Sequence, residues 1–337
     1  LKTIPQLVLF DEDGIPPELR AQRVLNKARV PEIASYIINN AKEYVFSSLT
    51  ASIDSQVHFI PFGKSGSESK MGVLVIPMTA RILINDGQHR RAAIEEALKH
   101  RPDIGLETIS VVFFIDSGLK KSQQMFADLN QHAVKPTKSL SILYDHRDPF
   151  SRFIKNNIIE SVPIFKGLTE LEKTTISNRS KKLFTLSSIY AGTKILLKKQ
   201  NKKENINEEE GKIVIEFWTE VTKYMPEWQE IIQQKVHSSE LREEFINVHG
   251  IVLHALGIVG QALFMEYPMN WKNKLKVLGK INWSRSNKKM WEGRAMLAGK
   301  ISKSHNNVIL TSNILKKLLK IKLTPQEMEI EKKFKKS

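Results

Sequence analysis

The spacing of apolar residues changes near residue 160. Before that point, short apolar runs alternate with segments in which apolar residues recur every three or four positions. Short runs are typical of strands, and the second spacing is typical of helices. Strands are predicted over 58–62, 73–76, 82–84 and 109–115, and the last three are expected to be buried. Helices are predicted over 20–45 with an interruption at Pro31, from Ala92 onward, over 120–131, and over 137–160 with a break at Asp148 and Pro149.

After residue 160 the helical spacing continues and no convincing strand pattern remains. It covers residues 185–200, 208–236 and 238–266. The part from Ile251 to Val259 is densely apolar, which predicts a buried central helix. The predicted fold class is therefore α+β, with a mixed α/β N-terminal domain over residues 1–160. A mainly helical domain with a basic C-terminal segment is predicted over residues 161–337.

Composition excludes several classes of protein. The 337 residues include no cysteine, so disulfides, cysteine nucleophiles and thiolate metal sites are excluded. The nine histidines show no metal-ligand spacing, and His249 and His254 are five positions apart, so no metal site is predicted. No apolar run reaches the roughly 18 residues of a membrane span, and the first residues do not resemble a secretory signal. We expect a cytoplasmic protein without a membrane partner.

The positive charge of the chain is concentrated at its C-terminal end. The net charge is +16, and residues 270–337 contain 18 Lys and Arg against 4 Asp and Glu. Such a segment is typical of proteins that bind the phosphate backbone of nucleic acids, although a solvated basic tail is the alternative. Trp271, Trp283 and Trp291 lie in the same segment. The residues predicted to contact double-stranded DNA are Trp283, Arg285, Lys288, Lys289, Arg294, Lys316 and Lys317.

A second candidate site lies where the predicted strand 82–84 gives way to a helix. The segment Asp86-Gly87-Gln88-His89-Arg90-Arg91 occupies this turn. The free N–H groups of a helix start favour an anion, and cations normally avoid that position. Two arginines and a histidine there indicate a multiply charged anion such as phosphate. The alternative is a surface turn with a solvated basic helix start.

The motif Asp-Gly-Gln-His-Arg at residues 86–90 also carries a family resemblance. Together with residues 21–37 and 126–136, it resembles the DndB branch of the DGQHR-domain proteins, which regulate DNA phosphorothioate (sulfur) modification. The resemblance implies an α/β fold similar to ParB and sulfiredoxin, whose relatives bind nucleotides through an equivalent turn. Sulfiredoxin carries its catalytic cysteine where this chain has Gln88, so sulfiredoxin chemistry is excluded.

The resemblance implies a nucleotide or phosphate site and its ligand. A nucleoside triphosphate with Mg²⁺ is the implied cofactor. Asp86 is expected either to cap the helix or to hold Mg²⁺. Asn130 matches a ParB position by its place after a helix, but the arginine expected beside it is replaced by Gln131 and His132. The predicted binding residues are Gln22, Arg23, Asp86, Gly87, Gln88, His89, Arg90, Arg91 and Asn130.

Three functions are compatible with these residues. The first is a DNA-binding transcriptional regulator of phosphorothioation genes, whose nucleotide would tune DNA binding. The second is a slow ParB-like NTPase, with Asp86, Gln88 and Asn130 positioning water or metal. The third is a non-catalytic component that docks on the DNA-modifying complex. The expected partners are double-stranded DNA, Dnd modification proteins and a second copy of the chain.

Overall fold

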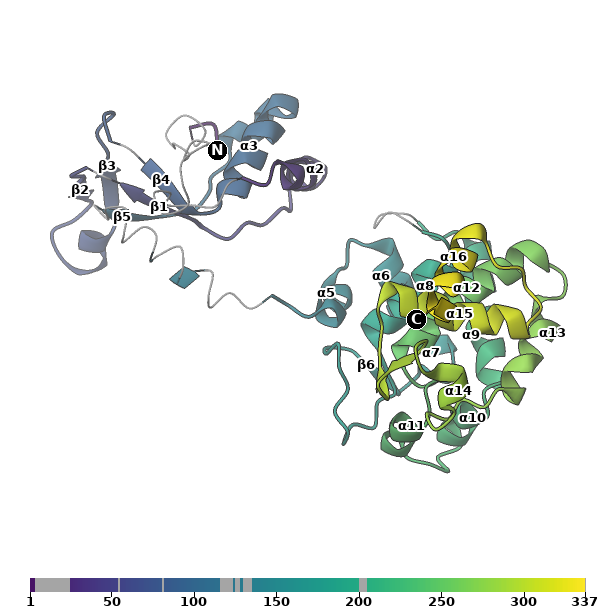
Figure 1. The fold of residues 1–337 in the computed structure, drawn as a ribbon. Helices are drawn as coiled ribbons and strands as arrows, with labels where there is room; N and C mark the ends of the chain where they lie inside the picture. Colours follow the sequence, from purple (N-terminus) through teal and green to yellow (C-terminus); the bar gives the residue numbers. More distant parts are fainter. Residues whose placement is uncertain are drawn as a thin grey trace. The chain divides into compact units, whose positions relative to one another are not determined.

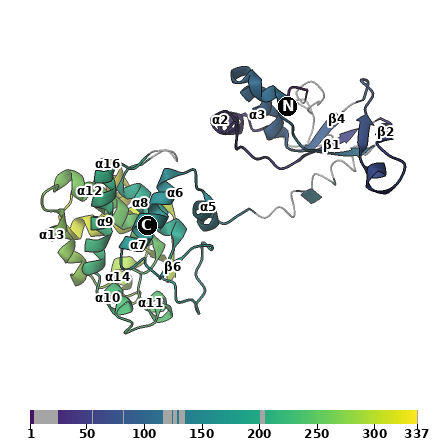
Figure 2. The ribbon, with the colours of Figure 1, turned by 180° about the vertical axis from the view of Figure 1, so that it is seen from behind.

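The computed structural model describes residues 1–3, 25–53, 55–80, 82–115, 124, 128–129, 135–199 and 205–336 (Figures 1 and 2). The chain divides into two compact units, unit 1 over Leu1–Val134 and unit 2 over Lys135–Ser337. The fold class is α+β, as predicted. Among the described residues, no helix combines the length and apolar character that crossing a membrane requires.

The division between the units falls earlier than the expected domain boundary at residue 160. The helices predicted over 137–160 pack with unit 2, because Ile142, Phe150 and Ile154 belong to its apolar core. These helices are α5 (Lys138–Tyr144), α6 (Pro149–Phe153), the π-helical turn Ile154–Ile158 and α7 (Ile159–Ser161). Sequence spacing shows that a segment is a helix, but it does not show which core the helix joins.

Unit 1 is built on a sheet of three strands in the order β4-β1-β5. The central strand β1 (Leu49–Ile53) pairs antiparallel with β4 (Ile82–Asp86) and parallel with β5 (Val111–Ile115). The sequence analysis did not predict β1. Its small and polar residues Thr50, Ala51 and Ser52 resemble a loop, yet every residue of the strand is buried.

A separate hairpin joins β2 (His58–Pro61) to β3 (Gly72–Val75) through the 3-10 helix Gly66–Lys70. We expected β3 and β5 to be buried, and this expectation is wrong for much of both strands. Val73 is 50% exposed and Ile115 is 51% exposed. β3 pairs with β2 alone and β5 lies at the sheet edge, and neither Val73 nor Ile115 belongs to an apolar core cluster of the described residues.

Two helices pack together in unit 1. They are α2 (Val30–Asn39) and α3 (Gln88–His100), and their shared core includes Ile37, Ala93 and Ile94. The 3-10 turns Lys27–Arg29 and Pro102–Leu106 flank them. Pro31 stands in the first turn of α2, where its missing N–H costs nothing, so it begins this helix instead of interrupting one.

Unit 2 is helical and contains α12 (Gly250–Glu266) as its central helix, which confirms that prediction. α12 packs against α8 (Leu186–Leu196) and α15 (His305–Leu318). The other elements are the two-residue strand pairs β6 (Thr169–Glu170) with β7 (Phe184–Thr185) and β8 (Met296–Leu297) with β9 (Lys300–Ile301), the 3-10 helix η6 (Lys276–Lys280), α9 (Glu208–Lys223), α10 (Pro226–Ile232), α11 (Ser238–Glu244), α13 (Trp271–Leu275), α14 (Lys288–Trp291) and α16 (Pro325–Lys336).

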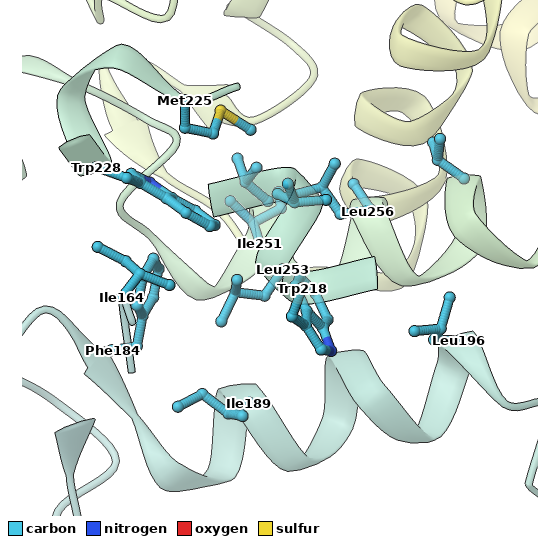
Figure 3. Close-up of a cluster of buried hydrophobic side chains, with 14 of the residues drawn as sticks. Ile164, Phe184, Ile189, Leu196, Trp218, Met225, Trp228, Ile251, Leu253 and Leu256 are labelled. Carbon is cyan, nitrogen blue, oxygen red and sulfur yellow. The ribbon is translucent and has the colours of Figure 1, made fainter. Parts of the chain in front are cut away.

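Large aromatic side chains fill the core around α12. Trp218 and Trp228 lie in the same apolar cluster as Leu253 and Leu256 (Figure 3). Glycines allow α8 and α12 to approach closely, since a Cβ on Gly257 would lie 2.4 Å from the carbonyl oxygen of Gly192. All five tryptophans belong to unit 2 and all are buried. Tryptophan fluorescence therefore reports on unit 2 alone.

Candidate functional site

The turn at Gly87 joins β4 to α3, as the sequence predicted. Gly87 has φ +106°, a left-handed conformation that glycine adopts readily. A Cβ at this position would lie 2.3 Å from Cδ2 of Leu49. Among the described residues, no side chain caps α3, so none of them provides a side-chain acceptor for the backbone N–H groups of its first turn. Such N–H groups attract an anion.

Arg90 binds protein groups on both sides of this turn. Its guanidinium contacts Oδ2 of Asp86 at 2.5 Å and the carbonyl oxygens of Ser47 at 2.6 Å and Ser48 at 3.1 Å. It also donates to the hydroxyl of Ser47. Asp86 does not cap α3, so of its two expected roles the structural one is wrong; the carboxylate pairs with Arg90 instead. Arg90 thereby holds the segment before β1 against the turn.

Two further motif residues face inward. Gln88 and Arg91 are both buried. Arg91 forms an ion pair with Glu95 one turn later in α3, at 3.2 Å, and burial lowers the pKa of its guanidinium. The arginines predicted to neutralise a phosphate are therefore both engaged with groups of unit 1.

His89 links the turn to the segment before α2. Its Nε2 accepts a hydrogen bond from the backbone N–H of Asn26 at 3.1 Å, which places the ring proton on Nδ1 when the imidazole is neutral. Burial, and then the charge of Arg29, lower the pKa of His89. Arg29 itself is exposed and has no ion-pair partner among the described residues. The structure thus brings the exposed cation Arg29 close to the turn over residues 86–91, which we call the signature turn.

Three of the predicted nucleotide-binding residues cannot be placed at this turn. Gln22, Arg23 and Asn130 lie outside the described residues.

The basic C-terminal segment is folded, and several of its predicted DNA contacts are internal. Trp283 is fully buried, stacked on Trp291 with ring centroids 5.3 Å apart, and its indole N–H donates to the carbonyl oxygen of Leu278. The prediction that Trp283 contacts DNA is therefore wrong. Its apolar ring is needed in the core of unit 2.

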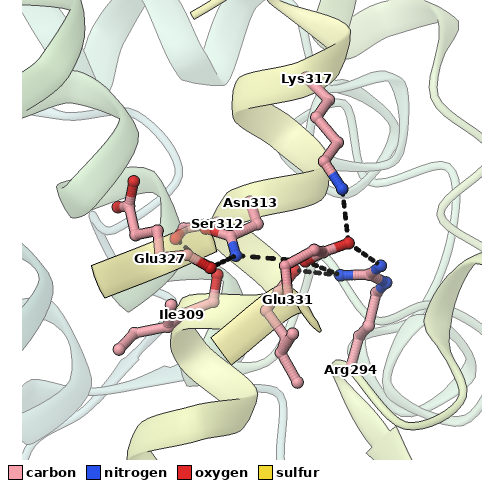
Figure 4. Close-up of polar contacts among 8 residues, drawn as sticks. Arg294, Ile309, Ser312, Asn313, Lys317, Glu327 and Glu331 are labelled. Carbon is pink, nitrogen blue, oxygen red and sulfur yellow. Dashed lines mark hydrogen bonds and ion pairs between the residues drawn. The ribbon is translucent and has the colours of Figure 1, made fainter. Parts of the chain in front are cut away.

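Buried ion pairs account for three more predicted contacts. Arg294 and Lys317 both pair with the carboxylate of Glu331 (Figure 4). Lys316 pairs with Glu327 at 2.6 Å. Arg294 and Lys316 are buried, so the prediction that they contact DNA is also wrong. Lys317 is on the surface but has a partner. These cations stabilise the packing of α16 on α15.

The remaining predicted contacts lie near the surface. The guanidinium of Arg285 donates to the carbonyl oxygens of Glu243 at 3.2 Å and Gly299 at 2.8 Å, so it holds two loops together. Lys288 and Lys289 are exposed, and their ammonium groups have no partner among the described residues. Of the seven predicted contacts, only these two lysines are both exposed and unpaired.

Other lysines of the C-terminal segment are also exposed and unpaired, and the sequence analysis did not name them as DNA contacts. All four acidic residues after position 269 are engaged: Glu292 accepts the N–H of Gly299, Glu327 and Glu331 form the pairs above, and Glu329 pairs with Lys333. In the described part of this segment, the exposed lysines without a hydrogen-bond or ion-pair partner are Lys276, Lys280, Lys288, Lys289, Lys300, Lys320, Lys322 and Lys332.

Two of the chain segments that carry these lysines lie side by side. Nζ of Lys274 donates to the carbonyl oxygen of Leu319, and the hydroxyl of Tyr267 donates to that of Lys320. These bonds hold the region of α13 next to the end of α15. We call Lys276, Lys280, Lys320 and Lys322 the lysine surface.

Comparison with known proteins agrees with the motif at the turn. A family model described as DndB, DNA-sulfur modification-associated, matches residues 1–322. The chain belongs to the DndB family. This DndB protein is therefore associated with DNA sulfur modification. No curated protein and no solved structure matched the chain.

The turn of this DndB protein provides part of what a nucleotide with Mg²⁺ requires. The first-turn N–H groups of α3 and the exposed Arg29 suit a phosphate. Asp86 is partly exposed, and its Oδ2 pairs with Arg90. Its Oδ1 has no partner among the described residues and could take one position on a metal ion. Among the described residues, no group of three histidine or carboxylate side chains gathers into a metal cage. Phosphate oxygens and water would have to supply the other ligands, as is usual for Mg²⁺.

Proposed function

We propose that this DndB protein is a DNA-binding transcriptional regulator of the phosphorothioation genes. The observation that supports the proposal is the imbalance of charge on the C-terminal segment of unit 2. Its acidic side chains are engaged with protein groups, while eight exposed lysines have no partner among the described residues. Lysines of this kind release counterions when they neutralise DNA phosphates, and this release provides most of the sequence-independent affinity.

The proposal is tested by measuring the affinity of the full chain for double-stranded DNA at several salt concentrations. Fluorescence anisotropy with DNA from upstream of the modification genes, and with a scrambled duplex, separates specific from non-specific binding. Replacement of the lysine surface (Lys276, Lys280, Lys320 and Lys322) by Gln should weaken binding to both duplexes. The log–log salt slope should fall in magnitude by up to about 0.9 for each lysine that contacts a phosphate.

A matched control removes the same charge elsewhere. Lys42, Lys64, Lys70 and Lys235 are exposed lysines outside the C-terminal segment. Their replacement by Gln should leave the salt slope almost unchanged. Equal slopes in the two variants would show that DNA does not bind the lysine surface. Equal affinity for the two duplexes would contradict a sequence-specific regulator.

We also propose that the signature turn binds the phosphate of a nucleotide and that this ligand tunes DNA binding. The left-handed Gly87, the uncapped start of α3 and the exposed Arg29 support this. The ParB-like NTPase is the alternative. It needs Gln88 and Asp86 beside the phosphates, but Gln88 is buried and Arg90 holds one oxygen of Asp86. The arrangement therefore favours binding over hydrolysis, and a phosphate-release assay with ATP, GTP and CTP distinguishes them.

A further inference from the structure

Unit 2 contains a pocket between α8 and α12 that none of the features above uses. Its volume is about 530 Å³, and the start of α5 closes one side. The polar side chains that line it are Lys138, Lys194, Lys198, Lys199, His254 and Gln261. None of the described residues that line it is an aspartate or a glutamate. Ligand pockets for small molecules usually span roughly 300–1,000 Å³, so this one could hold a small organic ligand.

The charge of this pocket is only partly compensated. Lys199 pairs with Glu210 at 2.9 Å. Lys138 and Lys198 are exposed and have no ion-pair partner in the part of the chain that the structure describes. Tyr190 also lines the pocket, and its hydroxyl donates to Oδ2 of Asp148 at 3.1 Å.

The carboxylate of Asp148 forms no ion pair with these lysines in the part of the chain that the structure describes. It accepts hydrogen bonds from the N–H groups of Phe150 and Ser151 and from the hydroxyl of Ser151. It therefore serves as the N-cap of α6, with its oxygens directed to that helix start. The pocket remains positively charged.

His254 lines the α12 side of the pocket. Its Nε2 is buried and has no hydrogen-bond partner among the described residues. A buried polar atom left unpaired costs about 1–3 kcal/mol, so its presence on an otherwise apolar helix needs an explanation. Burial, and then the charges of Lys303 and Lys138, lower the pKa of His254 to about 4. The imidazole is therefore neutral near pH 7, and a neutral ring can donate from Nε2.

A further lysine, Lys303, lies near the imidazole of His254. Nζ of Lys303 is 3.4 Å from the hydroxyl of Ser188 and occupies space that Gly250 leaves open. Burial lowers the pKa of Lys303. An anion in the pocket would therefore meet the imidazole of His254, the exposed side chains of Lys138 and Lys198, and the nearby charge of Lys303.

We propose that this pocket binds a small phosphate-bearing molecule, with Nε2–H of His254 donating to a phosphate oxygen and with Lys138 and Lys198 neutralising its charge. Ala191, Ile195 and the ring of Tyr190 line the same pocket and provide an apolar wall for the rest of the ligand. The pocket shares no lining residue with the signature turn or with the lysine surface. Unit 2 would therefore have a ligand-binding site that is built from its own residues.

Isothermal titration calorimetry of the full chain tests the proposal, with inorganic pyrophosphate and with ADP as probes. The double variant Lys138→Gln/Lys198→Gln should bind both probes at least tenfold more weakly than the wild type. The control Lys181→Gln/Lys235→Gln removes the same charge from exposed positions of unit 2 outside the pocket. It should change the affinity less than twofold. An equal loss in the two double variants would overturn the proposal, as would the absence of saturable binding to the wild type.

A second variant separates a binding role of His254 from a structural one. His254→Leu removes the unpaired Nε2, so the urea midpoint followed by tryptophan fluorescence should stay the same or rise. Affinity for pyrophosphate should nevertheless fall about tenfold or more. Unchanged affinity would overturn the proposal. Arg29→Gln is measured in parallel, because loss of binding in that variant alone would assign pyrophosphate to the signature turn and would also overturn the pocket.

Discussion

Arg294 and Glu331 form a bidentate ion pair inside unit 2. The two guanidinium nitrogens of Arg294 lie 3.0 and 2.6 Å from the carboxylate oxygens of Glu331, and the side chains are only 9% and 7% exposed. Burial alone would raise the pKa of Glu331, but hydrogen bonds from Arg294, Lys317 and Asn313 lower it to about 2. The pair therefore stays ionised and ties α16 to the segment that precedes β8.

We predict that Glu331→Gln destabilises unit 2 by about 3–5 kcal/mol, because it leaves the buried guanidinium of Arg294 without a counter-charge. Urea unfolding followed by tryptophan fluorescence measures this. Glu329→Gln is the matched control in the same helix, since Glu329 pairs with Lys333 on the surface, and it should have little effect. Similar midpoints for the two variants would contradict the assigned role of the buried pair.

We predict that Gly87→Ala destabilises unit 1. The new Cβ would clash with Leu49, and the left-handed backbone disfavours any residue with a Cβ, which together should cost about 1–3 kcal/mol or more. Amide hydrogen exchange of peptides from β4 and α3 should become faster. Gly105→Ala is a suitable control, because a Cβ there meets no atom closer than 3.3 Å. Unchanged exchange in Gly87→Ala would show that the turn can relax.

We predict that Arg90 and Arg29 have different roles at the signature turn. Arg90→Ala removes the contacts to Asp86, Ser47 and Ser48, so exchange in β1 and β4 should accelerate. Arg29→Gln should leave exchange unchanged and lower nucleotide affinity about tenfold, as expected for loss of a charge-assisted hydrogen bond of about 1.5–3 kcal/mol. Lys42→Gln is the exposed control in the same unit. If Arg29→Gln binds every nucleotide as tightly as the wild type, Arg29 does not meet the phosphate.

We predict that unit 2 loses stability as the pH falls from 6.5 towards 4. His249 and His254 have pKa values lowered by burial from 6.5 to about 4, so the unfolded chain takes up protons at a higher pH than the folded protein does. The stability is complete above pH 6.5 and decreases below it, by about 1.4 kcal/mol per pH unit for each histidine. The measurement is the urea midpoint by tryptophan fluorescence between pH 7 and 5.5.

The variant for this pH test is His249→Gln, whose amide can still donate to the carbonyl oxygen of Arg242, the acceptor of His249 at 3.0 Å. Its stability should depend less steeply on pH than that of the wild type. Parallel pH profiles would show that His249 titrates normally in the folded protein.

The signature turn shows how far the motif could be interpreted from sequence. Apolar residues up to Ile84 and helical spacing after Ala92 placed Gly87 correctly between a strand and a helix, since both patterns are local. The contacts of Arg90 with Ser47 and Ser48 could not be predicted, because more than 40 residues separate the partners in the chain. The two serines also directly precede β1, a strand that the sequence analysis missed. β1 was missed because its central residues Thr50, Ala51 and Ser52 are small or polar. Pairing with β4 on one side and β5 on the other makes this segment a strand.

The basic segment shows the same limit for electrostatics. Counting residues revealed the excess of lysine and arginine after position 269, but the count treats Arg294 and Lys288 alike. Folding buries Arg294 against Glu331 and leaves Lys288 exposed. The pocket beside His254 likewise depends on the crossing of α8 and α12, and no spacing in the sequence marks it.

By itself, the sequence determined the α+β class, the helical second half, the strand–turn–helix at Gly87 and membership of the DndB family. Each of these follows from residues that are neighbours in the chain, or from a family pattern that extends over residues 1–322. The tertiary structure alone decided which cations are exposed, that Arg29 lies near His89, and that His254 lines a basic pocket. Exposure and charge pairing depend on contacts between distant segments, and packing, not local spacing, selects those contacts.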